Sequence, residues 1–497
     1  MTDHTDRNRW IALYVLCVGM LMIVLDATVV NVALPSIQTD LHFTQSSLAW
    51  VVNAYLITFG GLLLLAGRLG DLAGRKRVFL GGLALFTLAS LACGLAQSQT
   101  VLVLARFLQG VGGALTSAVI LGMIVTMFGE PREQAKAIGV YGFVASAGGS
   151  VGLLAGGLIT QAIDWHWIFF INVPIGIATG LAAQRLLEHD SGIGFRAGAD
   201  VPGAVLITGA LMLGVYTIVK PAAEHGWGST QALALAAVSL VLLAAFIARE
   251  ATARNPLMPL RIFRSRNVSG ANAVQALLVA GMFGLFFLGA LYLQRVLGYD
   301  ALQIGLAFLP ATLVMGTMSL RFSERLMMSF GPKTTLIPGL TVTVVGLLLF
   351  ARAPVHGSYA VDVLPSMILL GLGIGGSFPA LMTLAMSGAT REDAGLASGL
   401  VNTAAQVGGA LGLAVLATLS ATHTKHLLAA GKSNVEALTG GYHLAFIISA
   451  GLMALAVAVA ALVLKAQAPA GAPAAAGEPV EEPEDERVAG EPVYSEV

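Results

Sequence analysis

The sequence predicts an all-α membrane protein, and three observations support this fold class. Of the 497 residues, 56% are hydrophobic and only 11% are charged, and the mean hydropathy is +0.82. Apolar runs of about 20 residues, long enough to cross a bilayer as a helix, recur along the chain. Lysines and arginines are dense in alternate loops between these runs and sparse in the others. Water-soluble domains do not combine these features.

Fourteen stretches have the length and composition of transmembrane helices. They are residues 10–33, 48–66, 78–96, 101–127, 136–160, 167–187, 201–219, 230–248, 268–294, 301–320, 334–351, 362–386, 395–421 and 442–464. The first run continues into Asn31 and Pro35 instead of ending at a small-residue cleavage site, so we expect a retained helix rather than a signal peptide. The two cysteines, Cys17 and Cys93, lie inside such runs, which predicts packing roles and no metal site.

The distribution of basic residues supports an even number of helices, because one missed helix would invert every later loop. With fourteen helices, 21 of the 27 lysines and arginines fall on the side of the N-terminus and five on the opposite side. Both termini are therefore predicted to be cytoplasmic. The composition, rich in Ala, Gly and Arg, is compatible with a high-GC bacterium and its inner (plasma) membrane. Basic and acidic residues balance at 27 each, so no nucleic-acid partner is expected.

The helices fall into two groups of six with an extra pair between them. Residues 1–190 are predicted to form an N-terminal six-helix bundle and residues 266–465 a C-terminal one. Residues 191–265 hold two additional helices and a cytoplasmic connector. Residues 466–497, rich in Ala, Pro and Glu, are expected to be a disordered cytoplasmic tail.

One acid and one base lie deep in the predicted spans. Asp26 interrupts the first span in the string L-D-A-T-V-V-N-V-A-L-P, and such a charge costs at least about 2.5–3.5 kcal/mol near the bilayer centre. Arg106 lies in L-V-L-A-R-F-L-Q-G-V-G-G-A. At ~1.5 Å per residue, Arg106 is roughly 8 Å and Asp26 roughly 13 Å below the outer ends of their helices. The two side chains are expected to pair, although Arg106 could instead reach the helix end.

Two glycine patterns accompany these charges. Residues 67–77 read G-R-L-G-D-L-A-G-R-K-R, in which glycines permit a tight turn and Asp71 can pair with a base or cap a helix. A plain positive-inside anchor is the alternative reading of its basic residues. Gly148, Gly152 and Gly156 recur at intervals of four, with Gly157 adjacent, and would present one small face to a neighbouring helix. Generic helix packing explains that spacing equally well.

These strings resemble the major facilitator superfamily, whose cytoplasmic signature is G-x-L-a-D-r-x-G-r-k. The first-span string and the fourteen-helix count narrow the resemblance to the drug:proton antiporter branch of the EmrB/QacA type. The resemblance implies a fold of two six-helix bundles plus two extra helices, and proton coupling by Asp26 and Arg106. It also implies conformational gating by Gly67, Asp71, Gly74 and Arg75, and antiporter helix packing by Gly148, Gly152, Gly156 and Gly157. The chain has Gly152-Leu153 where the antiporter motif commonly has Gly-Pro, which weakens the implied antiport.

The predicted function is efflux of hydrophobic or aromatic organic compounds, such as drugs and antibiotics, by a monomeric proton antiporter that works by alternating access. The proton motive force replaces any cofactor, and no enzymatic activity is expected, because the spans lack a constellation of His, Asp and Glu. Amides and aromatic side chains are predicted to line the substrate cavity: Asn31, Trp50, Asn53, Tyr55, Gln109, Gln294, Asn402 and Gln406. A proton-coupled symporter that imports a small organic nutrient is the alternative.

Overall fold

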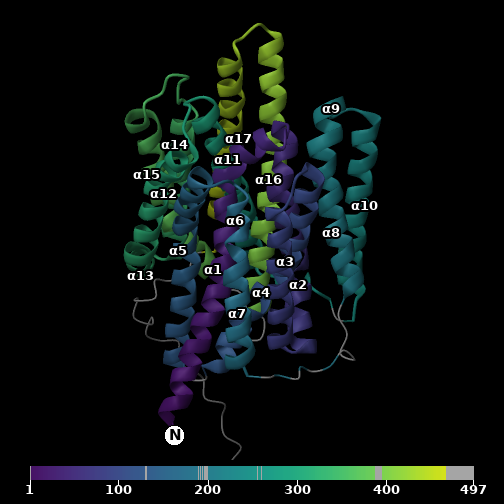
Figure 1. Cartoon of the computed structure of the whole chain (residues 1–497), viewed down its shortest axis with the longest axis vertical. Coiled ribbons are helices and arrows are strands. Elements are labelled where there is room, and N and C mark those ends of the chain that lie inside the picture. The colour runs from purple at the N-terminus through teal and green to yellow at the C-terminus, as the bar shows by residue number, and fades with distance from the viewer. Residues whose placement is uncertain are drawn as a thin grey trace, which may run out of the picture.

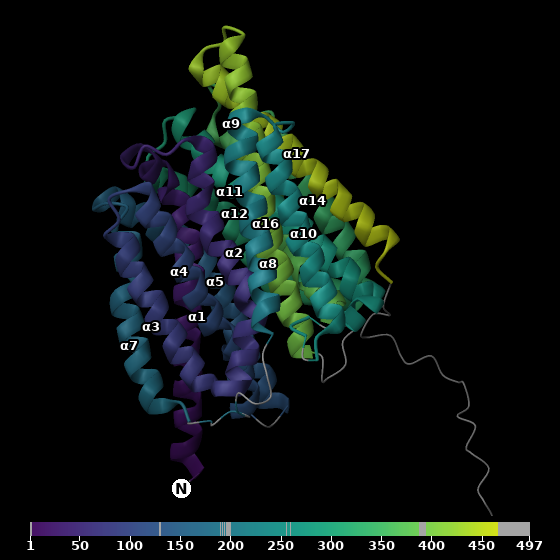
Figure 2. The same cartoon turned by 90° about the vertical axis from the view of Figure 1, so that its right-hand side faces the viewer.

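A computed structural model describes residues 2–465 except 129–130, 189, 191, 193, 195–199, 255, 259 and 387–393. These residues form helices and connecting turns, and no strand occurs among them (Figure 1). The predicted tail, residues 466–497, lies outside the described residues. We call the end of the bundle that carries the N-terminus the lower end, as drawn in Figures 1 and 2, and the opposite end the upper end.

The helices follow the order of the predicted spans. We refer to the first six long helices as the first bundle: α1 (Thr2–Asp40), α2 (Gln45–Ala73), α3 (Arg75–Gly94), α4 (Gln99–Met127), α5 (Pro131–Ala162) and α7 (Asn172–Leu186), with the single turn α6 (Trp167–Phe170). The extra pair is α8 (Val201–Thr217) and α10 (Thr230–Thr252), joined through η2 (Ile218–Ala222) and α9 (Ala223–His225). The turn η3 (Leu260–Arg264) leads to the second bundle.

The second bundle consists of α11 (Arg266–Arg295), α12 (Ala301–Thr317), α14 (Pro332–Phe350), α15 (Leu364–Met386), α16 (Ala394–Ala429) and α17 (Asn434–Leu462). The short elements η4 (Met318–Phe322) and α13 (Ser323–Phe330) follow α12, and η5 (Tyr359–Val363) precedes α15. In the described part of the chain, twelve helices are long and apolar enough to cross a membrane. The described part of the chain is thus an all-helical, multi-pass membrane protein with twelve such spans, where the sequence predicts fourteen.

Polar residues start several helices by local hydrogen bonding. Thr44, Asp300 and Ser433 each form a capping box at the start of α2, α12 and α17. In each box the cap side chain accepts a hydrogen bond from the third residue of the helix, whose own side chain accepts one from the cap backbone. These reciprocal bonds satisfy amides that a helix leaves unpaired at its first turn.

The extra pair packs on one side of the molecule, at the right in Figure 1. Helix α8 contacts α2 of the first bundle and α16 of the second, while α10 packs mainly on α8. Among the residues of α10, Ala232, Phe246 and Glu250 are buried, and the rest of its surface is largely open to the surroundings. The pair therefore covers one seam between the bundles.

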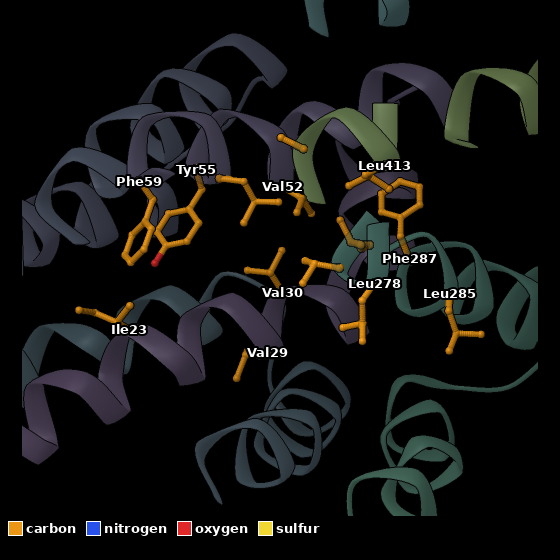
Figure 3. Close-up of a cluster of buried hydrophobic side chains, with 14 of the residues drawn as sticks. Ile23, Val29, Val30, Val52, Tyr55, Phe59, Leu278, Leu285, Phe287 and Leu413 are labelled. Carbon is orange, nitrogen blue, oxygen red and sulfur yellow. The ribbon is translucent and has the colours of Figure 1, made fainter. Parts of the chain in front are cut away.

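The two bundles meet tightly at the upper end. Side chains of α1 and α2, such as Val30 and Val52, lie opposite Leu278, Phe287 and Leu413 of α11 and α16 in a buried apolar cluster (Figure 3). Arg295 of α11 donates hydrogen bonds to Gln38 Oε1 at 3.1 Å and Thr39 Oγ1 at 3.0 Å of α1. Gln45 of α2 donates one to Ser420 of α16 at 3.1 Å. These contacts close the upper end.

Candidate functional site

A buried ionic network occupies the core of the first bundle. Asp26 of α1 and Arg106 of α4 are each 1% exposed. Arg106 Nη1 donates to Asp26 Oδ2 at 2.5 Å. Gln109 Nε2 donates to the other carboxylate oxygen at 2.7 Å, and Asn172 Nδ2 of α7 does so at 3.0 Å. The carboxylate charge is thus compensated by one guanidinium and two amides, as a buried charge requires.

The guanidinium of Arg106 is held from several directions. Its Nε donates to the backbone oxygen of Val51 at 2.9 Å, and its Nη1 also donates to Gln109 Oε1 at 2.6 Å. Its Cζ atom lies 4.4 Å from the centroid of the Tyr55 ring and 5.8 Å from that of Phe169. Hydrogen bonds and two aromatic faces therefore keep the cation beside Asp26 without water contact.

A further helix, α3, completes the network. Ser90 of α3 accepts hydrogen bonds from Gln109 Nε2 at 2.8 Å and from Asn172 Nδ2 at 3.4 Å. Sequence reasoning missed Ser90 and Asn172, although Asn172 is a lone amide in the apolar string I-F-F-I-N-V-P. Gln109, predicted as a cavity residue, belongs to this network, in keeping with its place three residues after Arg106 on one helical face.

A cavity of about 630 Å³ lies between the bundles and opens at the lower end. Its deep part is lined by Ile23 and Ala27 of α1, three residues before Asp26 and one residue after it. Its mouth reaches Gly67, Arg68, Asp71 and Arg75, at the turn between α2 and α3. Helices α11 and α16 supply Phe283 and the amides of Asn402 and Gln406. The wall is therefore largely apolar, with a few polar groups, as in sites for organic ligands.

The predicted cavity residues divide among several places. Tyr55, Asn402 and Gln406 line the cavity at the lower end. Gln294 lines a separate, shallow pocket of about 610 Å³ at the upper end. Asn31 and Asn53 are buried and Trp50 half-buried, and none of these three is in the lining of either cavity. Their roles in substrate binding remain predictions.

One ion pair and several hydrogen bonds, which we call the latch, hold the turn between α2 and α3. Arg75 pairs with Asp71 at 3.2 Å and donates a hydrogen bond to the Gly122 backbone oxygen of α4 at 2.9 Å. Asp190, which follows α7, accepts bonds from the backbone N–H groups of Arg75 at 2.7 Å and Lys76 at 3.2 Å. Asp190 thus caps α3.

Gly74 starts this cap with φ +98°, and a Cβ there would collide with Asp190. Only glycine suits this conformation and this approach.

The glycines of α5 face two different helices. Gly148 and Gly152 lie against α1, next to Val24 and Thr28. Gly156 also faces α1, where a Cβ would lie 2.9 Å from the Val29 backbone oxygen. Gly157 faces α12, where a Cβ would lie 2.7 Å from the Ala301 backbone oxygen. Helix α5 therefore packs between its own bundle and the second one, which close packing of small residues allows.

Comparison with known proteins identifies the family to which this chain is related. The family model described as Major Facilitator Superfamily matches residues 16–413. The puromycin resistance protein pur8 of Streptomyces alboniger is 39% identical over 461 residues, which cover 92% of this chain and 91% of that protein. The cephamycin export protein CmcT of Amycolatopsis lactamdurans is 39% identical over 415 residues, 83% of this chain and 85% of the relative.

A solved structure shows the same fold at low sequence identity. The crystal structure of a bacterial homolog of the human lysosomal transporter Spinster covers 92% of this chain and 97% of its own, with 16% identity and a TM-score of 0.66. The family match covers most of the chain, and the related proteins are antibiotic resistance and export transporters. The protein is a transporter rather than an enzyme, and the chain belongs to the Major Facilitator Superfamily.

Proposed function

We propose that this transporter exports hydrophobic or aromatic organic compounds, antibiotics among them, in exchange for protons. The relatives named for puromycin resistance and cephamycin export support the drug class. The buried ion pair of Asp26 and Arg106 carries the proposed proton coupling, because a carboxylate next to the cavity but sealed from it can hold a proton between conformations. The protein works as a monomer, without a bound cofactor.

The proposed cycle is alternating access of one cavity between the bundles. The structure has a cavity open at the lower end and a closed upper end. If the lower end is cytoplasmic, as the basic loops predict, this is the state that receives substrate from the cell. One charge moved through 100 mV supplies ~2.3 kcal/mol, equivalent to roughly a 50-fold gradient of substrate. One proton per cycle is therefore enough for useful resistance.

We further propose that fourteen helices cross the membrane, in the arrangement of the EmrB/QacA branch. Helix α5 has 32 residues, about 48 Å at ~1.5 Å per residue. Helix α12 is apolar and continues through η4 and α13 to Phe330. With these two, the chain crosses the bilayer an even number of times and both termini lie in the cytoplasm. The gating role of Gly67, Asp71, Gly74 and Arg75 belongs to this proposal too.

Transport in inside-out vesicles tests the proposed function. Vesicles with wild-type protein are expected to take up drug in exchange for internal protons when an acid interior is imposed. The Asp26→Asn variant should bind drug but lose uptake driven by the gradient, whereas Glu224→Gln, at an exposed acid, should behave as wild type. Gradient-driven uptake by Asp26→Asn at the wild-type rate would rule out Asp26 as the coupling acid.

The direction of flux separates the alternative, a symporter that imports a nutrient. A symporter in the same vesicles would move its substrate out together with protons. Survival assays against an antibiotic panel that includes puromycin, in a pump-deficient bacterium, identify the substrate class. Unchanged sensitivity to every compound of the panel would contradict drug export.

A further inference from the structure

We propose that Tyr55 couples the substrate to the proton: a substrate in the cavity holds the Tyr55 ring against Arg106 and thereby stabilises the ionised Asp26. This inference rests on the proposed antiport function and names the residue that links its two sites. The substrate it implies has an aromatic body and at least one N–H or O–H group.

Tyr55 belongs to both sites at once. Its ring covers the guanidinium of Arg106 at 4.4 Å, and the same residue lines the cavity. Figure 3 shows its hydroxyl directed toward Ile23 of α1, beside Phe59, and both of these residues also line the cavity. Tyr55 lines the cavity whereas Asp26 and Arg106 do not, so its side chain lies between the ion pair and the cavity. A substrate in the cavity would therefore contact the ring of Tyr55 and not the ion pair itself.

The hydroxyl of Tyr55 is an unsatisfied buried group. Among the described residues, Tyr55 Oη, Ser117 Oγ and Gln406 Oε1 have no hydrogen-bond partner, and all three residues line the cavity. Buried polar groups without partners destabilise a fold unless they serve a ligand or bind water. A substrate at Gln406 Oε1 would have to donate a hydrogen bond, whereas the two hydroxyls can donate or accept. An aromatic compound with an amine, amide or hydroxyl group meets these requirements between Phe59 and Phe283.

The energetic link between substrate and proton runs through Arg106. A cation packed on an aromatic face is attracted to it, most strongly where water is excluded. A substrate that immobilises the Tyr55 ring therefore favours the position of Arg106 beside Asp26, which favours the carboxylate over the carboxylic acid. On binding, the Asp26 carboxyl gives up its proton to water at the lower end. Drug entry is thus coupled to proton release, as exchange requires.

The groups around Asp26 define the expected pH dependence. Arg106 and Gln109 of α4, Ser90 of α3 and Asn172 of α7 contact the carboxylate or its partners, and Cys93 lies 3.6 Å from Gln109 Oε1. Within this network, Asp26 carries the carboxyl group whose proton we propose the substrate displaces. Substrate binding that releases its proton must be tighter at high pH than at low pH, by linkage.

Substitutions at Tyr55 test the link by proton release. Purified wild-type protein in weakly buffered detergent is titrated with puromycin, and bound drug and released protons are measured together. Tyr55→Phe keeps the ring, so it should bind puromycin about 2- to 10-fold more weakly, for one lost hydrogen bond, and still release protons at saturation. Tyr55→Met removes the aromatic face, so most of the proton release per bound drug should be lost at the same pH.

Phe59→Met is the matched control. Phe59 lines the same cavity one helical turn along α2, on the far side of Tyr55 from Val51, whose backbone binds Arg106. This variant should bind puromycin more weakly but release the wild-type number of protons at saturation. Tyr55→Leu serves as a second variant if Tyr55→Met does not fold. The pH dependence of the puromycin Kd, compared between wild type and Tyr55→Phe, should be the same.

The outcomes distinguish this inference from the proposed function. Full proton release per bound puromycin in Tyr55→Met or Tyr55→Leu overturns the role of Tyr55 and leaves antiport intact. Loss of proton release in Phe59→Met to the same extent, or a Kd in Tyr55→Phe that no longer depends on pH, also overturns it. If wild-type protein binds puromycin without releasing protons, the proposed proton exchange fails, and the role of Tyr55 with it.

Discussion

The two six-helix bundles turn at their lower ends in the same way but differ in charge. In the first bundle, Gly74 has φ +98° and Lys76 Nζ donates to the backbone oxygens of Gln184 at 2.8 Å and Leu187 at 2.5 Å. In the second, Gly331 has φ +83° and Lys333 Nζ donates to Ala461 at 2.8 Å and Leu464 at 2.7 Å. Each lysine thus binds the C-terminal carbonyls of the last helix of its own bundle.

Two ion pairs of the first bundle, Asp71 with Arg75 and Asp26 with Arg106, have no counterpart in the described part of the second. At the turn, Met328 and Pro332 take the places of Asp71 and Arg75, counted from the glycine. Among the described residues 266–465, no Asp, Glu, Lys or Arg side chain is buried, whereas the first bundle buries Asp26 and Arg106. The lysine contact is therefore part of the shared scaffold. The buried ion pair of Asp26 and Arg106 belongs to the first bundle, while the second bundle supplies apolar side chains and amides to the cavity lining.

The largest expected effect comes from breaking the ion pair of the first bundle. Arg106→Met leaves Asp26 as an uncompensated buried charge, which costs about 3–5 kcal/mol of folding stability. We expect a much lower apparent melting temperature in detergent and no gradient-driven transport. Arg352→Met, at an exposed arginine of the second bundle, is the control and should change neither.

A second substitution sharpens this result. Asp26→Asn removes the unpaired charge, so Arg106→Met combined with Asp26→Asn should recover part of the lost stability but not transport. A double variant less stable than Arg106→Met alone would contradict the electrostatic explanation.

The next effect in size concerns the packing of α5. Gly156→Ala places a Cβ 2.9 Å from the Val29 backbone oxygen, which cannot rotate away as a side chain can. Overpacking of this kind costs about 1–3 kcal/mol. A Cβ at Gly149 meets nothing within 4 Å, so Gly149→Ala should be neutral or slightly stabilising. Thermal unfolding of both variants provides the comparison, and equal stability would argue against close packing on α1.

A smaller effect is expected from the latch charges. Asp71→Asn removes a half-exposed ion pair worth at most about 1 kcal/mol of stability, so melting should barely change while the transport rate falls. The reverse experiment is Met328→Asp in the second bundle. Because residue 332 is proline and offers no guanidinium, the new acid should not raise the transport rate, measured by drug uptake in vesicles. A faster Met328→Asp transporter would show that the acid acts without its arginine.

The smallest effects should come from the feature that the bundles share. Lys76→Met and Lys333→Met each remove a cation at a helix C-terminus, worth about 0.3–1 kcal/mol. Their unfolding temperatures should fall by similar, small amounts. A large loss for Lys76→Met alone would mean that this lysine also belongs to the latch of the first bundle.

The sequence predicted what depends on single unusual residues. A lone acid and a lone base in apolar spans indicated Asp26 and Arg106, and the structure brings them together. Contacts between distant segments could not be predicted from the sequence. Asp190 caps a helix that begins 115 residues earlier in the chain, and no local sequence pattern indicates that role. Gln109 was predicted to line the cavity for the same reason. Helical spacing shows which face of the helix Gln109 lies on, but not which side chains of other helices it contacts. The cavity itself depends on how the bundles are tilted, which apolar periodicity does not determine.

The hairpin of α8 and α10 has a consequence for how such transporters diversify. Both of its helices have one end at the lower end of the molecule, so the chain enters and leaves the pair on the same side (Figure 2). A hairpin of this kind can be gained or lost as a module without reversing the insertion of the six helices that follow. The outer helix α10 buries only Ala232, Phe246 and Glu250, so substitutions elsewhere on its surface should leave the packing of the two bundles intact.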